Sequence, residues 1–172
     1  AVSPSEQLVI YRELYCSKVT ATDLADMILE TESSDSSIRY GVLDSSLWHK
    51  RGDTGPSLAE QMNAKGCRWR PSDRSRGSRV AGKNELHRRL QVDEFTEEPR
   101  LVFFSSCTNM IAQLPGLPLD KKNPEDVDTN AEDHLYDALR YGIMTRPRSS
   151  LWDFNPMSQR SGFQASDSTF GY

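Results

Sequence analysis

Up to about residue 146, short apolar runs alternate with longer amphipathic stretches. Short runs rich in β-branched and aromatic residues predict strands, and apolar residues spaced three or four apart predict helices. The predicted strands are 7–15, 38–44, 67–69 and 101–104. The predicted helices are 20–30, 57–65, 80–90, 107–114 and 131–144. Because the two kinds of element alternate, the pattern predicts an α/β sandwich with a mixed or parallel sheet.

The last predicted helix carries the most informative pattern. At about 100° per residue, Asp133, Asp137 and Arg140 fall on one face of this helix. The opposite face, which we expect to pack against the core, is formed by Leu135, Ala138, Leu139, Gly142 and Ile143. Acidic residues also favour any helix N-terminus, and Asp137 with Arg140 could be an ordinary i,i+3 ion pair. The acidic face is therefore either structural or one half of a metal site.

Asp44 offers a facing carboxylate for that second interpretation. It ends the apolar strand predicted at 38–44. A carboxylate at the end of a buried strand, placed opposite an acidic helix, could hold a divalent cation. The combination of Asp44 with the acidic helix favours the metal-site hypothesis over an ordinary helix cap.

Composition indicates a soluble protein with one domain and a thin core, since 172 residues include 27% charged and 36% hydrophobic residues. No apolar run approaches the roughly 18 residues that a membrane span needs. Cys16, Cys67 and Cys107 are scattered and odd in number, which indicates reduced cytosolic thiols and not a disulfide framework or zinc site. The N-terminus lacks both a signal-peptide pattern and an initial Met, so we expect a processed or excised piece of a longer chain.

Charge is unevenly distributed along the chain. The net charge is −4, but residues 65–89 contain nine Lys and Arg against Asp73 and Glu85. This segment thus carries +7 and the remainder carries −11. A concentrated basic strip on an acidic protein is consistent with a contact to a polyanion, although a charge run alone is more often a solvated surface loop.

The end of the chain differs in composition from the rest. Pro, Ser, Gln, Gly and isolated aromatic residues replace the periodic pattern. We expect a domain over 1–146 and an extended or flexible tail over 147–172. The aromatic residues of the tail could dock on another surface or form a strap over the domain's own core.

Three sequence blocks occur in an order that resembles the C-terminal nuclease domain of tailed-bacteriophage terminase large subunits. The resemblance spans about residues 7 to 146, and its last block is the most specific. The first block is 9–15, followed by a helix that begins at a Thr. The second is 42–44, followed by the helix at 57–60. The third combines 103–109, 125–129 and 132–141.

The resemblance implies an RNase H-like fold, with a mixed central sheet flanked by helices. It implies a hydrolase that cuts concatemeric double-stranded viral DNA during genome packaging. The expected cofactor is Mg²⁺ or Mn²⁺ in a two-metal site, with the ions roughly 3.5–4 Å apart. The implied catalytic and metal-ligating residues are Asp44, Asp133 and Asp137. Asp133 is slightly favoured over Asp137 because it starts the helix, and His134 is either a neighbour of the cluster or a surface residue.

The same resemblance implies that DNA is held by its phosphates, with little reading of bases. The candidate contacts are Arg70, Arg74, Arg76, Arg79 and Lys83, joined by Lys50 and Arg51. Trp48 and Trp69 are interpreted as packing residues, and Asp126 and Asp128 as loop and capping groups. The implied partners are double-stranded DNA, the terminase motor domain, the small subunit and the portal protein. We expect a host-cytoplasmic location, no membrane contact, and a monomer as an isolated domain.

One part of the family pattern is missing. Such nucleases take their first catalytic Asp from a strand that precedes the segment matching 7–15, and residues 1–6 contain no Asp. Glu13 is a poor substitute, so we expect an N-terminally truncated nuclease domain. No Gly-x-x-x-x-Gly-Lys-Ser/Thr loop occurs, so this chain does not contain the motor. The alternatives are a catalytically incomplete DNA-binding or portal-docking module, and another RNase H-like enzyme such as a resolvase or transposase.

Overall fold

A computed structural model describes residues 7–35, 38–50, 52, 55–128 and 130–145. Its strands are β1 (Leu8–Ile10), β2 (Gly41–Leu43), β3 (Trp69–Pro71) and β4 (Leu101–Phe103). Its α-helices are α1 (Ala21–Glu32), α2 (Leu58–Ala64), α3 (Ser78–Leu90), α4 (Thr108–Gln113) and α5 (His134–Met144). Two 3₁₀ turns, η1 (Ser45–Trp48) and η2 (Leu114–Gly116), complete the described elements. The described part of the chain is therefore a mixed α/β structure, as expected, and the proposed tail at 147–172 lies outside it.

The strands form two separate parallel pairs. Strand β1 pairs with β4, with Leu8 opposite Leu101, and β2 pairs with β3, with Gly41 opposite Trp69. Among the described residues no strand joins the two pairs into one sheet. The strands predicted at 7–15 and 38–44 were too long, because only three residues of each find a ladder partner.

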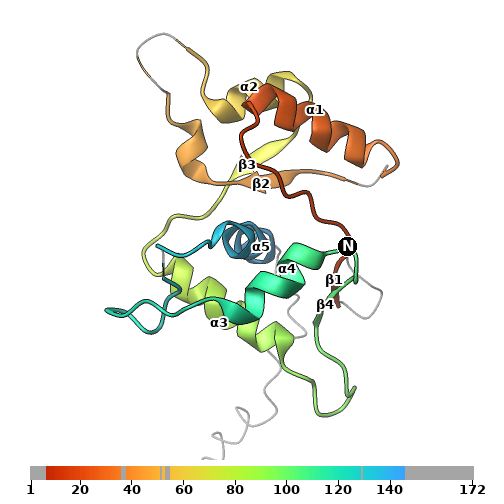
Figure 1. Cartoon of the computed structure of the whole chain (residues 1–172), viewed down its shortest axis with the longest axis vertical. Coiled ribbons are helices and arrows are strands. Elements are labelled where there is room, and N and C mark those ends of the chain that lie inside the picture. Colours follow the sequence, from red (N-terminus) through yellow and green to blue (C-terminus); the bar gives the residue numbers. More distant parts are fainter. Residues whose placement is uncertain (1–6, 36–37, 51, 53–54, 129, 146–172) are drawn as a thin grey trace, which may run out of the picture.

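Two hydrophobic clusters follow this division (Figure 1). Helices α1 and α2 cover the β2–β3 pair around Ala25, Met62 and Cys67. The second and larger cluster joins β1, β4, α3, α4 and α5, and includes Leu101 and Tyr136. Helix α5 lies between the β2–β3 pair and α3, and so links the two groups.

The starts of α1 and α2 follow local capping chemistry. The Thr20 hydroxyl accepts a hydrogen bond from the Asp23 amide and begins α1, as its position predicted. Ser57 and Glu60 form a capping box at the start of α2. Helix α5 begins three residues later than predicted, with Asp133 at its N-cap position. No helix among the described residues is long and apolar enough to cross a bilayer.

The buried face of α5 is only partly the one predicted. Leu135, Leu139 and Ile143 are buried, whereas the predicted core residues Ala138 and Gly142 are exposed. Helix α5 packs on α3 as well as on the core, and its acidic residues Asp133 and Asp137 contact Arg79 of α3.

Arg140 is buried by this packing of α5 on α3. Its aliphatic stem lies where a side chain on Gly82 would stand, since a Cβ atom there would come within 2.5 Å of the Arg140 Cγ atom. Arg140 is therefore 3% exposed despite its charge. The acidic face of α5, which was predicted to point away from the core, instead borders α3.

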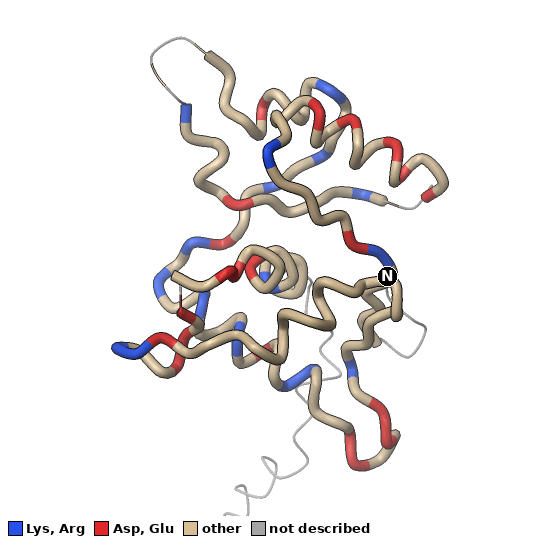
Figure 2. Tube along the Cα trace, in the orientation of Figure 1, with Lys and Arg blue, Asp and Glu red and all other residues tan. Residues whose placement is uncertain are grey.

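Basic residues follow the connection from β3 to α3 (Figure 2). Arg70, Arg74 and Arg76 are exposed, and the Arg70 guanidinium stacks over the Tyr40 ring at 4.1 Å from its centroid. Lys83 is 8% exposed, and its ammonium donates to the Pro124 carbonyl at 3.1 Å. The described strip is thus solvated before α3, and within α3 Lys83 is buried whereas Arg88 stays exposed.

Candidate functional site

Asp44 stands where β2 ends. One carboxylate oxygen accepts from the Ser46 amide at 2.6 Å and so starts the η1 turn. The other accepts from the Tyr141 hydroxyl at 2.6 Å. Ser72, just after the neighbouring strand β3, accepts from the Ser45 amide at 3.1 Å. Because β2 and β3 are parallel, their ends form one edge, and α5 lies against it.

Tyr141, 97 positions after Asp44 in the sequence, brings the two predicted ligands Asp44 and Asp137 together. Its hydroxyl also lies 3.3 Å from Asp137. Burial and the contact with Asp44 raise the pKa of Tyr141, so the hydroxyl remains a neutral donor. Burial alone would raise the pKa of Asp44, but hydrogen bonds from Ser46 and Tyr141 lower it below its ordinary value. Asp44 is therefore an ionised carboxylate at neutral pH.

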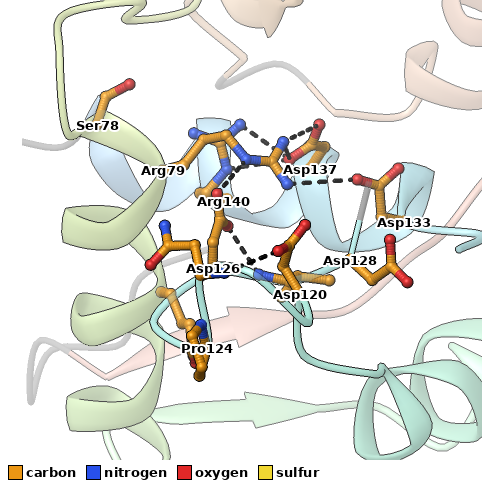
Figure 3. Close-up of polar contacts among 12 residues, drawn as sticks. Ser78, Arg79, Asp120, Pro124, Asp126, Asp128, Asp133, Asp137 and Arg140 are labelled. Atoms are coloured by element: carbon orange, nitrogen blue, oxygen red, sulfur yellow. Dashed lines mark hydrogen bonds and ion pairs between the residues drawn. The ribbon is translucent and has the colours of Figure 1, made fainter. Parts of the chain in front are cut away.

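Arg79, in the first turn of α3, lies at the centre of a carboxylate cluster (Figure 3). Its guanidinium donates to Asp126 at 2.9 Å, to Asp137 at 3.4 Å and to Asp133 at 3.5 Å. Burial alone would lower the pKa of Arg79, but the bond to Asp126 and the charge of Asp137 raise it. The guanidinium therefore stays charged and screens three carboxylates from one another. We call Arg79, Asp126, Asp133 and Asp137 the α3–α5 ion cluster.

Asp137 is also held by Arg140 from its own helix. The Arg140 guanidinium donates to one oxygen of Asp137 at 2.8 and 3.1 Å, and it stacks over the Tyr141 ring at 4.5 Å from its centroid. Only 4% of the Arg140 side chain is exposed. The i,i+3 ion pair between Asp137 and Arg140, which the sequence predicted as the structural alternative to a metal site, is therefore present. It coexists with the Tyr141 hydroxyl contacts that bring Asp137 close to Asp44.

A cleft of about 440 Å³ opens beside these groups. Charged side chains from β2, the β3–α3 loop, α3, the loop before α5, and α5 itself line it: Asp44, Arg74, Arg79, Asp126, Asp137 and Arg140. Three hydroxyl residues, Ser72, Ser75 and Ser78, border the same space. The cleft thus offers anionic and cationic groups side by side.

The predicted ligands are brought together only in part. The carboxylates of Asp44 and Asp137 meet through the Tyr141 hydroxyl, whereas those of Asp133 and Asp137 meet through the Arg79 guanidinium. His134 is a surface residue, since 82% of its side chain is exposed and its nearest carboxylate oxygens are 3.9 and 4.0 Å away. Glu13 is remote from the cluster, because its carboxylate accepts from the first turn of α4.

Sequence reasoning missed Asp126 as a cluster member. We interpreted it as a loop group, yet it makes the shortest contact with Arg79. Asp128 does fit that interpretation, since it accepts from the Asn130 amide in a turn. No periodic pattern separates these two acids in an irregular loop. The sequence feature that indicated a cationic neighbour was the excess of acidic residues in 117–130.

The fit to a divalent cation is poor in this conformation. Among the described residues, no group of three or more His, Cys, Asp or Glu side chains is arranged to hold a metal ion. The oxygens of Asp133 and Asp137 face the Arg79 guanidinium, and those of Asp44 face an amide and a hydroxyl. The ligand types suit Mg²⁺ or Mn²⁺, but their present partners are protein donors.

The other sequence-predicted contacts lie in varied settings. Lys50 is exposed, and Arg51 lies outside the described residues. Trp69 packs against the cluster beneath α1, as interpreted, and Trp48 ends η1 partly buried. All three cysteines are free thiols, as expected.

Comparisons of this chain with protein-family models, with curated proteins and with solved structures find no match.

Proposed function

We propose that this chain belongs to an RNase H-like, divalent-cation-dependent endonuclease that cuts double-stranded DNA, as the terminase large subunits that it resembles do. The observation that supports this most directly is the meeting of Asp44, at the end of β2, with Tyr141 and Asp137 of α5. A strand-end carboxylate facing an acidic helix is the arrangement that the resemblance implies. The carboxylates border a cleft whose lining also includes Arg74, Arg79 and Arg140.

The charges around the cleft support a phosphate-containing substrate. Arg74 lines the cleft beside Asp44, and Arg70 and Arg76 are exposed on the adjoining segment. Guanidinium groups bind phosphates bidentately and carry no base specificity by themselves. Asp44, Asp133 and Asp137 remain the proposed ligands of Mg²⁺ or Mn²⁺. The motor domain, the small subunit and the portal remain the proposed partners in the host cytoplasm.

A second candidate is a DNA-binding or portal-docking module without catalysis. Its support is the α3–α5 ion cluster, in which a guanidinium and not a free space lies among the carboxylates. A permanent network of ion pairs of this kind would stabilise the fold and would not bind a metal cation.

Plasmid nicking separates the two candidates. Supercoiled DNA is incubated with the chain and Mn²⁺, beside an EDTA control and the variants Asp44→Asn and Asp137→Asn. The matched control is Asp26→Asn, an exposed acid on α1 that pairs only with Lys65 in a surface contact. We expect nicking by the wild type and the control, and loss in the two site variants and in EDTA.

Other outcomes would change the assignment. DNA retardation without nicking in any cation would favour the non-catalytic module. A strong preference for branched junctions over linear duplex would favour a resolvase-like enzyme.

A further inference from the structure

An apolar groove of about 810 Å³ runs along the face of α5 that the sequence predicted to be buried. Ala138 and Gly142 line it and are exposed, next to the buried Leu139 and Ile143. The other walls come from β1 and the segment after it, from α4, and from the residues just before β2. The groove shares no lining residue with the cleft beside Asp44. An apolar face left open in this way is typical of a docking surface.

The charged groups at the groove are unequally satisfied. The Glu13 carboxylate accepts from the first turn of α4, and the Arg12 guanidinium pairs with Asp35 at 3.0 Å. Arg39, by contrast, is exposed and forms no ion pair with another described residue. The groove therefore favours an occupant that is mainly apolar and carries an acidic group for Arg39.

The described chain ends at the edge of this groove. Thr145 is the last described residue, and its carbonyl oxygen lies 3.5 Å from the Tyr40 hydroxyl. Tyr40 and Ile143 both belong to the groove wall. Residues 146–172 lie outside the described part of the chain and follow directly from this point. Apolar groups that they carry are thus tethered beside the groove at a high effective concentration.

Residues 151–154, Leu-Trp-Asp-Phe, have the composition that the groove favours. Three large apolar residues flank one acid, Asp153, whereas the later pair Phe170 and Tyr172 has only a glycine between its members. In an extended segment alternate side chains share a face, so Trp152 and Phe154 can enter an apolar groove together. Asp153 would then face the rim, where Arg39 is exposed.

The connection is long enough for this arrangement. Leu151 follows Thr145 by six residues, which span up to about 20 Å when extended. The α5 wall of the groove, from Leu135 to Ile143, is only about 12 Å long at 1.5 Å per residue. The segment can therefore turn back after α5 and reach any point along the groove.

We propose that residues 151–154 dock in the groove of their own chain, with Trp152 and Phe154 against α5 and Asp153 beside Arg39. Aromatic side chains bury about 150–250 Å² each and so supply most of the contact. Because residues before β2 line the groove together with β1 and α5, the docked segment ties the two strand pairs together. This inference goes beyond the proposed nuclease function and does not depend on it.

The first test compares the thermal unfolding of full chains. The double variant Trp152→Ser, Phe154→Ser removes both anchors, and Phe170→Ser, Tyr172→Ser removes an aromatic pair of the same spacing as a control. We expect the anchor variant to lower the unfolding midpoint by at least about 2 °C, a shift that a modest loss of stability produces in a chain of this size. The control should match the wild type. Equal midpoints in all three proteins would overturn the inference.

The second test supplies the segment as a separate peptide. A fluorescein-labelled peptide of residues 147–158 is titrated with full chains, and fluorescence anisotropy reports binding. The anchor variant, whose own segment is disabled, should bind the peptide. The wild type should bind it at least about tenfold more weakly, because its tethered segment competes. Absence of binding to the anchor variant, or equal binding by the two proteins, would overturn docking within the chain.

Groove variants locate the binding surface. Added to the anchor variant, Ala138→Glu places a carboxylate in the apolar wall and should abolish peptide binding. Ala64→Glu, at an exposed alanine of α2 outside the groove, is the matched control and should leave binding unchanged. Arg39→Gln should weaken binding several-fold. Full binding by both Ala138→Glu and Arg39→Gln would show that the peptide binds elsewhere and would overturn the inference.

Sedimentation velocity identifies whose groove the segment fills. Docking within one chain predicts a wild type that sediments as a monomer at every concentration. Association of the wild type that grows with concentration and is lost in the anchor variant would place the segment in the groove of a second copy. That result would overturn docking within the chain.

Discussion

Asp137 shows how much a single side chain depends on its neighbours in this fold. It accepts hydrogen bonds from Arg140 and Arg79 and lies beside the Tyr141 hydroxyl. Removing one member of a buried ion pair leaves the other charge desolvated and uncompensated. The balance of charges at Asp137 therefore affects stability as well as any chemistry at the cleft.

Arg140→Met tests that balance. Methionine keeps much of the side-chain volume but removes both hydrogen bonds to Asp137, whose side chain is 21% exposed. We expect a loss of about 2–3 kcal/mol in the free energy of unfolding, somewhat below the value for a fully buried pair. Urea denaturation measures it, and the exposed Arg88→Met should cost less than about 1 kcal/mol. Adding Asp137→Asn should recover part of the loss, and equal losses in the two arginine variants would contradict the argument.

Glu13 gives a residue-scale prediction with a definite pH dependence. Its carboxylate accepts from the Asn109 amide and side chain at 2.8 Å and from the Met110 amide at 3.0 Å. Burial alone would raise the pKa of Glu13, but these hydrogen bonds lower it below its ordinary value near 4.5. Because the pKa of Glu13 is lower in the folded state, its ionised carboxylate stabilises the fold when the pH is above the ordinary pKa. This stabilisation is lost as the pH falls through the lowered pKa of the folded state.

Glu13→Gln should therefore lower the free energy of unfolding by about 1 kcal/mol at pH 7, less than the roughly 1.5–3 kcal/mol of hydrogen bonds to charged groups, because the side-chain carbonyl of Gln can still accept and the site is only half-buried. Urea denaturation of both proteins between pH 7 and pH 3 measures the difference. The difference should begin to shrink as the pH falls below the ordinary value of 4.5 and should vanish once the pH passes below the lowered pKa of Glu13, where the wild-type carboxylate is protonated. A difference that stays constant with pH would show that the charge of Glu13 is irrelevant to α4.

At the scale of elements, the contact between α3 and α5 depends on a glycine. A Cβ atom at Gly82 would stand 2.5 Å from the Arg140 Cγ atom and 2.7 Å from its Cδ atom. Gly82→Ala should displace Arg140, loosen its bonds to Asp137 and destabilise the protein by about 1–3 kcal/mol. This loss would outweigh the roughly 1 kcal/mol that alanine contributes in a helix interior.

Gly142→Ala in α5 is the matched control, since no atom outside the helix lies within 4 Å of its Cβ position. It should raise the thermal unfolding midpoint, because only the helix propensity changes. Thermal denaturation of both variants measures the contrast. Stabilisation by both substitutions would show that α5 does not depend on close approach at Gly82.

Local and long-range features were not equally predictable from sequence. All five α-helices of the described residues were predicted, because apolar spacing is a local signal and, for α1 and α2, so are capping residues such as Thr20. The strands were overextended, since β-rich composition does not reveal how many residues find a partner. The approach of Asp44 to α5 was predictable from a strand end and a helix face. The pairing of Arg79 with Asp126 was not, because both belong to polar segments without periodicity.

At the scale of the whole molecule, the cleft lies at the junction of the two structural groups. Asp44 and Ser72 come from the β2–β3 group, and the facing residues come from α3 and α5. The Asp44–Tyr141 hydrogen bond and a long one from the Tyr40 hydroxyl to the Thr145 carbonyl, at 3.5 Å, join the groups here. A ligand in the cleft therefore contacts both groups at once.

The solvated part of the basic strip predicts how DNA binding depends on salt. Each phosphate contact releases about 0.9 counterions, so its loss reduces the slope of log affinity against log salt by about that amount. We expect Arg74→Gln and Arg76→Gln each to reduce the slope by roughly 0.9, because both side chains are exposed beside the cleft. Lys83→Gln should leave the slope unchanged and lower thermal stability, because the Lys83 ammonium is buried against the Pro124 carbonyl.

Fluorescence anisotropy of a labelled duplex, titrated at several KCl concentrations in EDTA, measures these slopes without cleavage. A slope reduction for Lys83→Gln equal to that for Arg74→Gln would mean that α3 turns its buried lysine outward to meet DNA. In that case DNA would contact the whole basic strip, residues 65–89, and not only the part of it beside the cleft.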